Sequence, residues 1–223
     1  MTAIFVTATG TDVGKTFVTT GLIRHLRAAG RAADAIKPVV SGFNADDPAD
    51  SDPALLLEAL GRPLTDIDRI CRWRFAAPLA PAMAAKREGR AIEFNSLVDF
   101  CRRAVVGHRD IMFIEGVGGI MVPLDDKHTV LDWMTALRLP LLLVVGSYVG
   151  TISHTLTALQ VLARRNLDVA AVIVSESADS AASLEETVET IARFADSIDV
   201  IGIPRLPRDV TSHHGFDRLA AIL

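Results

Sequence analysis

Short apolar runs alternate with longer amphipathic segments along most of the chain. The runs show little alternation of polar and apolar residues, which is typical of strands buried on both faces in a parallel sheet. They cover residues 3–8, 32–39, 110–116, 139–146, 169–175 and 198–204. The amphipathic segments predict helices at about 15–29, 95–107, 129–138, 152–166 and 183–195. This order predicts an α/β fold with an open, mostly parallel sheet flanked by helices in Rossmann-like layers.

No repeat, low-complexity segment or linker divides the sequence, so we expect a single domain over residues 1–223. The polar stretch 41–53 and the irregular stretch 75–81 are expected to be loops. No basic region precedes the N-terminal apolar run, and the run at 139–146 is shorter than the about 20 residues that cross a bilayer. A cytoplasmic protein with no membrane partner is therefore expected.

Composition narrows the classes of partner. Half of the residues are hydrophobic and 22% are charged, as in globular proteins. The formal net charge of −4 provides no broad basic surface, so nucleic acid is not an expected partner. Cys71 and Cys101 lack metal-ligand spacing and are expected to be reduced structural thiols.

A phosphate-binding loop is predicted directly after the first run, because ligands of parallel sheets lie beyond the carboxyl ends of the strands. Residues 9–16 read TGTDVGKT and precede a predicted helix. Backbone N–H groups and the helix dipole favour phosphate oxygens at such a turn. Lys15 adds a cation for the β- and γ-phosphates, and the Thr16 hydroxyl suits Mg²⁺. The loop therefore predicts ATP as co-substrate with Mg²⁺.

This loop departs from the usual spacing. The usual first glycine falls at Thr9, whereas Gly10 follows one residue later. The alternative interpretation is an ordinary strand–turn–helix with a chance Gly-Lys-Thr sequence.

Charged residues follow two other runs. Glu115 ends a buried run, where an acid is costly unless it meets a cation or hydrogen-bond donors. It is a candidate metal-linked acid, and capping of the next turn is the alternative. Lys37 ends the second run and is expected to point toward the phosphate side. Asp52 precedes an apolar helix, and the residues alone support two interpretations of it equally: a helix N-cap and a residue of the phosphate site.

Residues 150–153 begin a helix after the fourth run and are expected to present free N–H groups to a carboxylate or phosphate. A simple Ser/Thr-capped helix is the alternative there. The glycines behind Glu115 let the backbone approach a ligand closely.

Together these motifs resemble the dethiobiotin synthetases, the ATP-dependent ligases that close the ureido ring in biotin synthesis. The matching segments span nearly the whole chain: FVTATGTDVGKT (5–16), KPVVSG (37–42), the Ser51-Asp52 pair, PLAPAMAA (78–85), EGVGG (115–119), VVGSYVGTISH (144–154) and GIP (202–204). Family members share the displaced first glycine of the phosphate loop. They carry glycine, however, where this chain has Ala8.

The resemblance implies roles for individual positions. The implied Mg²⁺ ligands are Thr16, Asp52 and Glu115. The implied catalytic lysines are Lys37 and Lys15. The residues implied to surround the ATP phosphates are Asp12, Val13, Gly14, Lys15, Thr16 and Phe17, and those also implied to bind ATP are Gly116, Val117 and Gly118. Those implied to contact the diamine substrate are Thr11 and Ser41, and those implied to bind its carboxylate are Gly150, Thr151, Ile152 and Ser153. Those implied around adenine are Ser175, Glu176, Pro204, Arg205 and Leu206.

One implied role is weakened by a departure from the family. At Ser175 the family usually has an asparagine, which offers adenine both a donor and an acceptor. Serine is shorter, so the resemblance does not imply strict selection of ATP over other triphosphates.

The implied reaction joins 7,8-diaminononanoate and CO₂ at the expense of ATP and gives dethiobiotin, ADP and phosphate. It passes through a carbamate and a carbamic–phosphoric anhydride, and the family implies a homodimer. A partitioning-type switch ATPase is the alternative; such proteins usually carry an additional lysine early in the loop, where this chain has Thr9, Gly10 and Thr11. The amide-forming ligase of cobalamin synthesis, which shares the fold, normally adds a glutaminase domain for which this chain has no room.

Overall fold

The computed structural model describes residues 3–107 and 111–223, and a six-stranded parallel sheet forms the centre of this part of the chain. The strand order is β2-β5-β1-β6-β7-β8. The strands are β1 (Ala3–Ala8), β2 (Ala33–Ile36), β5 (Ile111–Glu115), β6 (Leu141–Val145), β7 (Val169–Ser175) and β8 (Asp199–Ile203). Asp110, predicted at the start of the third run, lies outside the described residues. The predicted α/β fold is confirmed.

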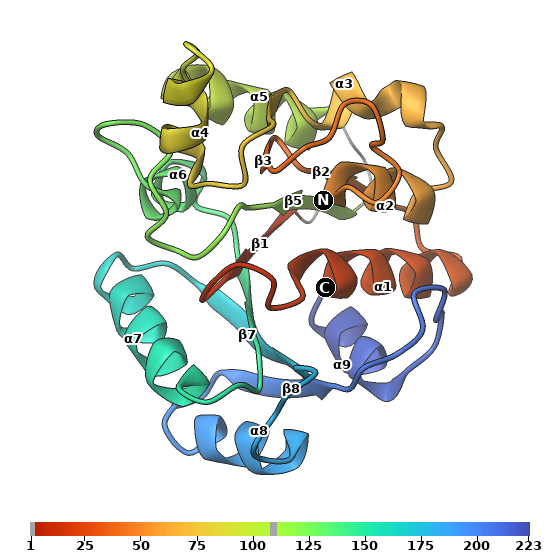
Figure 1. The fold of residues 1–223 in the computed structure, drawn as a ribbon. Helices are drawn as coiled ribbons and strands as arrows, with labels where there is room; N and C mark the ends of the chain where they lie inside the picture. The colour runs from red at the N-terminus through yellow and green to blue at the C-terminus, as the bar shows by residue number, and fades with distance from the viewer. Residues whose placement is uncertain (1–2, 108–110) are drawn as a thin grey trace.

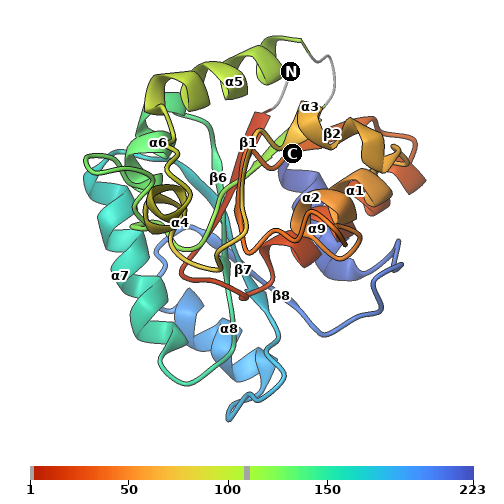
Figure 2. The same ribbon diagram turned by 45° about the horizontal axis from the view of Figure 1, so that its top comes forward.

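Helices cover both faces of this sheet (Figure 1, Figure 2). On one face lie α1 (Lys15–Ala28), α2 (Asp52–Ala59) and α9 (His214–Ile222). On the other lie α5 (Phe94–Val106), α6 (Val130–Leu137), α7 (Thr151–Arg164) and α8 (Leu184–Ala192). The five helices predicted from amphipathic segments are all present, with ends shifted by a few residues.

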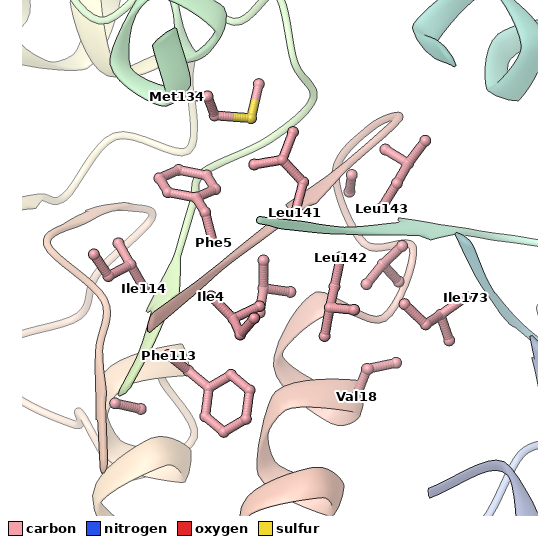
Figure 3. Packing of buried hydrophobic residues seen from close by; sticks show 14 of the residues in the cluster. Ile4, Phe5, Val18, Phe113, Ile114, Met134, Leu141, Leu142, Leu143 and Ile173 are labelled. Carbon is pink, nitrogen blue, oxygen red and sulfur yellow. The ribbon is translucent and has the colours of Figure 1, made fainter. Parts of the chain in front are cut away.

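Apolar side chains fill both sides of the sheet, which explains why the strands lack polar alternation. Phe5 and Met134 lie on the α6 side, whereas Leu142 and Val18 lie on the α1 side (Figure 3). The ring of Phe5 meets Trp133 edge to face, with centroids 4.8 Å apart. Such a pair adds about 0.5–1.5 kcal/mol to the stabilisation from burial alone.

The second predicted run is interrupted. A continuous strand over residues 32–39 is wrong, because β2 ends before Lys37 and a separate strand, β3 (Val39–Ser41), follows Pro38. Proline has no N–H to donate to a sheet, so the ladder cannot continue through it. β3 instead pairs in parallel with β4 (Trp73–Phe75) in a small second sheet. Lys37 thus lies at the junction of two sheets.

Short elements occupy parts of the expected loops. They are the 3₁₀ helix η1 (Leu64–Asp66), α3 (Ile67–Ile70) and α4 (Pro81–Arg87). Both cysteines are free and buried, and burial raises the pKa of each thiol to about 12. The helices of the described residues are all too short or too polar to cross a membrane.

The C-terminal helix packs tightly on α1 (Figure 1). Phe216 is fully buried beside Gly21, and a Cβ at Gly21 would lie 2.3 Å from Cζ of Phe216. Glycine within a helix costs about 1 kcal/mol relative to alanine. Close approach of α9 explains why glycine stands at this position.

Candidate active site

The turn between β1 and α1 leaves several backbone N–H groups free. Gly14 has a φ of 99°, in the left-handed region that favours glycine. Its Cα lies so near β7 that an added Cβ would be 2.4 Å from Oγ of Ser175. Within the described residues, the N–H groups of Gly14, Lys15, Thr16 and Phe17 donate no hydrogen bond. Such a helix N-terminus attracts an anion.

Lys15 lies beneath this turn. Its Nζ donates to the carbonyl oxygen of Gly10 at 3.0 Å, and the residue is 7% exposed. Burial, followed by the nearby Lys37 ammonium, lowers the pKa of Lys15 to about 8. A bound anion would favour its protonated form.

A buried ion-pair cluster follows β2 and β5. Nζ of Lys37 lies 2.7 Å from Oε1 of Glu115 and 2.9 Å from Oδ2 of Asp52. Lys37 is 1% exposed and Glu115 is fully buried. Burial alone would lower the pKa of Lys37, but the two carboxylates outweigh it and raise the pKa above its ordinary value. Lys37 is therefore held as an ammonium ion.

The same cluster reaches the phosphate loop through Thr16, whose hydroxyl donates to Oε1 of Glu115 at 2.7 Å. Burial would raise the pKa of Asp52, yet the Lys37 ammonium and the Thr16 hydroxyl lower it. Asp52 is the first residue of α2, and Ser51 occupies the N-cap position, so the N-cap interpretation of Asp52 is wrong.

The oxygen atoms of this cluster fit a magnesium ion. Mg²⁺ is usually held by one or two carboxylates together with phosphate oxygens and water. Thr16, Asp52 and Glu115 bring two carboxylates and a hydroxyl together. Oε2 of Glu115 is buried and has no hydrogen-bond partner among the described residues, so one carboxylate oxygen remains free for a ligand. No group of three or more His, Cys, Asp or Glu side chains in the described part of the chain is placed to hold a metal ion by itself.

A cavity of about 860 Å³ opens beside the cluster. Its walls include the predicted site residues Thr11, Asp12, Gly14, Lys15, Thr16, Phe17, Lys37, Ser41, Asp52, Val117 and Gly118. The hydroxyl of Ser41 is buried without a hydrogen-bond partner in the described residues. The volume is in the range of small-molecule sites.

Comparison with known proteins agrees with this geometry. The family described as an AAA domain matches residues 2–212. The "ATP-dependent dethiobiotin synthetase BioD" of Caulobacter vibrioides is 49% identical over 207 residues, 92% of this chain and 93% of that protein. The protein of the same name from Acidiphilium cryptum is 46% identical over 196 residues, 86% of this chain and 88% of that protein.

The chain belongs to the dethiobiotin synthetase family.

Solved structures support the fold alone. A MinC:MinD cell division complex from Aquifex aeolicus has a TM-score of 0.57 at 15% identity, covering 98% of this chain and 86% of that one. The signal recognition particle receptor FtsY from Elizabethkingia anophelis has a TM-score of 0.54 at 16% identity, covering 99% of this chain and 65% of that one. The chain therefore shares its layered architecture with distant proteins.

Two groups of predicted site residues lie outside the cavity. The first begins α7, where the N–H of Thr151 donates to the carbonyl of Tyr148 at 3.1 Å and its hydroxyl donates to Gly146 at 2.7 Å. The prediction of a free N–H is therefore wrong for Thr151. The N–H groups of Ile152 and Ser153 have no hydrogen-bond acceptor among the described residues.

The second group lies at the ends of β7 and β8, which pair side by side. Oε2 of Glu176 accepts a hydrogen bond from the N–H of Arg205 at 2.9 Å. The side chain of Ser175 lies against Gly14 of the phosphate loop. The residues expected around adenine thus form a connected surface beside the loop expected to hold phosphates.

Sequence reasoning assigned no role to part of the cavity wall. These lining residues are Val40, Gly42, Asp50, Ser51, Pro78, Leu79, Ala80, Pro81 and Val122. The PLAP segment resembled the family but carries no side chain whose chemistry predicts a site. Apart from Asp50 and Ser51, the side chains of this wall are small or apolar and suit an alkyl chain more than a charged group.

Proposed function

We propose that this chain catalyses the ATP-dependent closure of the ureido ring of dethiobiotin from 7,8-diaminononanoate and CO₂, as the names of its relatives indicate for those proteins. The observation that supports it best is the buried Lys37 ammonium, which lies between two carboxylates in the wall of the cavity beside the phosphate loop. Phosphoryl transfer depends on fixed charge and positioning, and the cluster supplies fixed charge rather than an acid–base dyad.

The proposed reaction has three steps. One amine of the substrate adds to CO₂ and loses a proton, giving a carbamate. A carbamate oxygen then attacks the γ-phosphorus of ATP and displaces ADP, giving a carbamic–phosphoric anhydride. Finally the second amine attacks the carbamate carbon, expels phosphate and closes the five-membered ring. Negative charge moves near the γ-phosphate in each of the later steps.

Each lysine has a distinct place in this scheme. Lys15, together with the free N–H groups at the start of α1, would hold the β- and γ-phosphates. Lys37 would stabilise the charge that develops between the carbamate and the γ-phosphate. Thr16, Asp52 and Glu115 would hold Mg²⁺, which neutralises phosphate charge when bound. Positioning and electrostatics then carry the reaction without a covalent nucleophile.

The second substrate would occupy the cavity. Thr11 and Ser41 would contact the amines, and the unpaired hydroxyl of Ser41 supports this role. The free N–H groups of Ile152 and Ser153 lie outside the cavity, so in a homodimer they would bind the carboxylate near the subunit boundary. We also propose one catalytic domain and a homodimer.

A phosphate-release assay tests the proposal. ATP and Mg²⁺ are supplied with and without 7,8-diaminononanoate and bicarbonate, and dethiobiotin is identified by mass spectrometry. We expect release to depend on the diamine. Release that ignores the diamine would refute the synthetase reaction and favour a switch ATPase.

A pair of variants then tests Lys37. Lys37→Met should lower turnover about 10²-fold or more, with a much smaller effect on ATP binding. Lys86→Met is the matched control, because Lys86 lies on an exposed turn of α4 away from the cavity. Near-normal turnover of Lys37→Met would show that the role assigned to Lys37 is wrong.

A further inference from the structure

Two serines join the loop after β6 to the loop after β7 through reciprocal hydrogen bonds. The N–H of Ser147 donates to Oγ of Ser177 at 3.0 Å, and the N–H of Ser177 donates to Oγ of Ser147 at 2.9 Å. Ser147 is only 3% exposed. A two-point contact of this kind fixes the relative orientation of two loops as well as their separation.

The surrounding residues are arranged to permit this contact. A Cβ at Gly146 would lie 2.8 Å from Oγ of Ser177, so only glycine leaves room for the hydroxyl. The hydroxyl of Ser180 donates to the carbonyl of Ser147 at 2.5 Å. Thr151 bonds the carbonyl of Gly146 and ties the same loop to α7. The serine pair therefore belongs to a larger hydrogen-bond network that also includes Thr151 and Ser180.

This network extends to the surface proposed to meet the nucleoside. Ser177 follows directly after Glu176, which accepts a hydrogen bond from the backbone of Arg205. One residue earlier, Ser175 lies against Gly14 of the phosphate loop. The segment 175–177 is thus held by β8 on one side, by the phosphate loop on another, and by Ser147 at its end.

The strand order places this segment opposite the cavity. Lys37, Asp52 and the cavity residues outside the phosphate loop come from the β2 and β5 side of β1, whereas β6, β7 and β8 lie on the other side. A triphosphate on the loop after β1, with its γ-phosphate toward Lys37, would therefore extend its nucleoside toward β7 and β8.

We infer that Ser147 and Ser177 are positioning residues for the nucleoside part of ATP, acting through the segment 175–177 rather than by contact with ATP. The inference rests on the proposed ATP site. The phosphates have their own partners at the start of α1, which the serine pair does not touch. Loss of the pair should therefore weaken the binding of ATP and leave the binding of inorganic tripolyphosphate unchanged.

Calorimetric titration of the full chain with ATP and with tripolyphosphate, each with Mg²⁺, tests this difference. Ser177→Ala should raise the Kd of ATP about fivefold, the net worth of one hydrogen bond. The Kd of tripolyphosphate should stay within about twofold of wild type. Ser147→Ala should behave alike. The double variant should lose less than the product of the single effects, because both bonds hold the same two loops.

Ser183→Ala is the matched control. Its hydroxyl caps α8 by accepting from the N–H of Glu186 at 3.1 Å, and among the described residues it has no hydrogen bond to either serine of the pair. This variant should lower Tm without changing either Kd. The inference would be overturned if Ser177→Ala and Ser147→Ala weakened the binding of ATP and of tripolyphosphate equally, or if they left the Kd of ATP unchanged. Diamine-independent phosphate release would refute the proposed reaction but not this inference, because the Kd values of ATP and tripolyphosphate would still test it.

Discussion

Removal of the Lys37 ammonium should destabilise the fold strongly. Lys37→Met preserves the length of the side chain but leaves the carboxylate of Glu115, which is fully buried, without its cation at 2.7 Å. Breaking a buried ion pair by removing one partner costs about 3–5 kcal/mol. For a chain of this size about 2–4 °C of Tm corresponds to each kcal/mol, so Tm should fall by about 6–20 °C.

The origin of this loss can be separated from packing by a second substitution. Glu115→Gln in the Lys37→Met background removes the stranded charge, so the double variant should regain a large part of the lost stability. Thermal unfolding followed by circular dichroism measures the wild type, Lys37→Met, Glu115→Gln and the double variant, with Lys86→Met as the exposed control. A loss below about 1 kcal/mol for Lys37→Met, or strictly additive losses in the double variant, would refute the reasoning.

Three further predictions concern other parts of the molecule. Gly21→Ala should destabilise the fold by about 1–3 kcal/mol despite the better helix propensity of alanine, and Phe216→Leu in that background should restore part of the loss in urea unfolding. Ser175→Asn should raise the preference for ATP over CTP and GTP in the phosphate-release assay; unchanged ratios would show that this position does not select the base. Asp52, whose pKa the Lys37 ammonium lowers against the effect of burial, stabilises the fold above its ordinary pKa of 3.8 and loses this contribution as the pH falls through its lowered value. Asp52→Asn should therefore flatten the acid limb of the stability–pH curve, and an unchanged limb would contradict the pairing.

The strands could be predicted because their residues are apolar on both sides, and this pattern depends on the local sequence alone. In the sequence, Pro38 is the one sign of the break after β2, and the apolar pattern continues beyond this proline to residue 39. β4 escaped prediction because its three residues include Arg74 and pair only with the equally short β3. α9 escaped because its stability comes from the contact of Phe216 with a distant helix.

The candidate site divides in the same way. Glu115 and Lys37 could be predicted because each follows a buried strand, and parallel strands bring their carboxyl ends together. Asp52 could not be separated from Asp46, Asp47 and Asp50 by sequence alone, because a loop of unknown path brings it to Lys37. The bond between Thr151 and Tyr148 depends on the turn geometry of one loop, which residue types do not specify.

The packing of α9 on α1 has a consequence for the order in which the protein can mature on the ribosome. The helix that begins with the phosphate loop is synthesised early, but the side chain that covers Gly21 comes from residues 214–222. During translation the apolar flank of α1 would remain uncovered until this late segment leaves the exit tunnel, a period when exposed apolar surface promotes aggregation. A nascent chain arrested before Phe216 would contain every residue of the proposed site and still lack the helix that packs against α1.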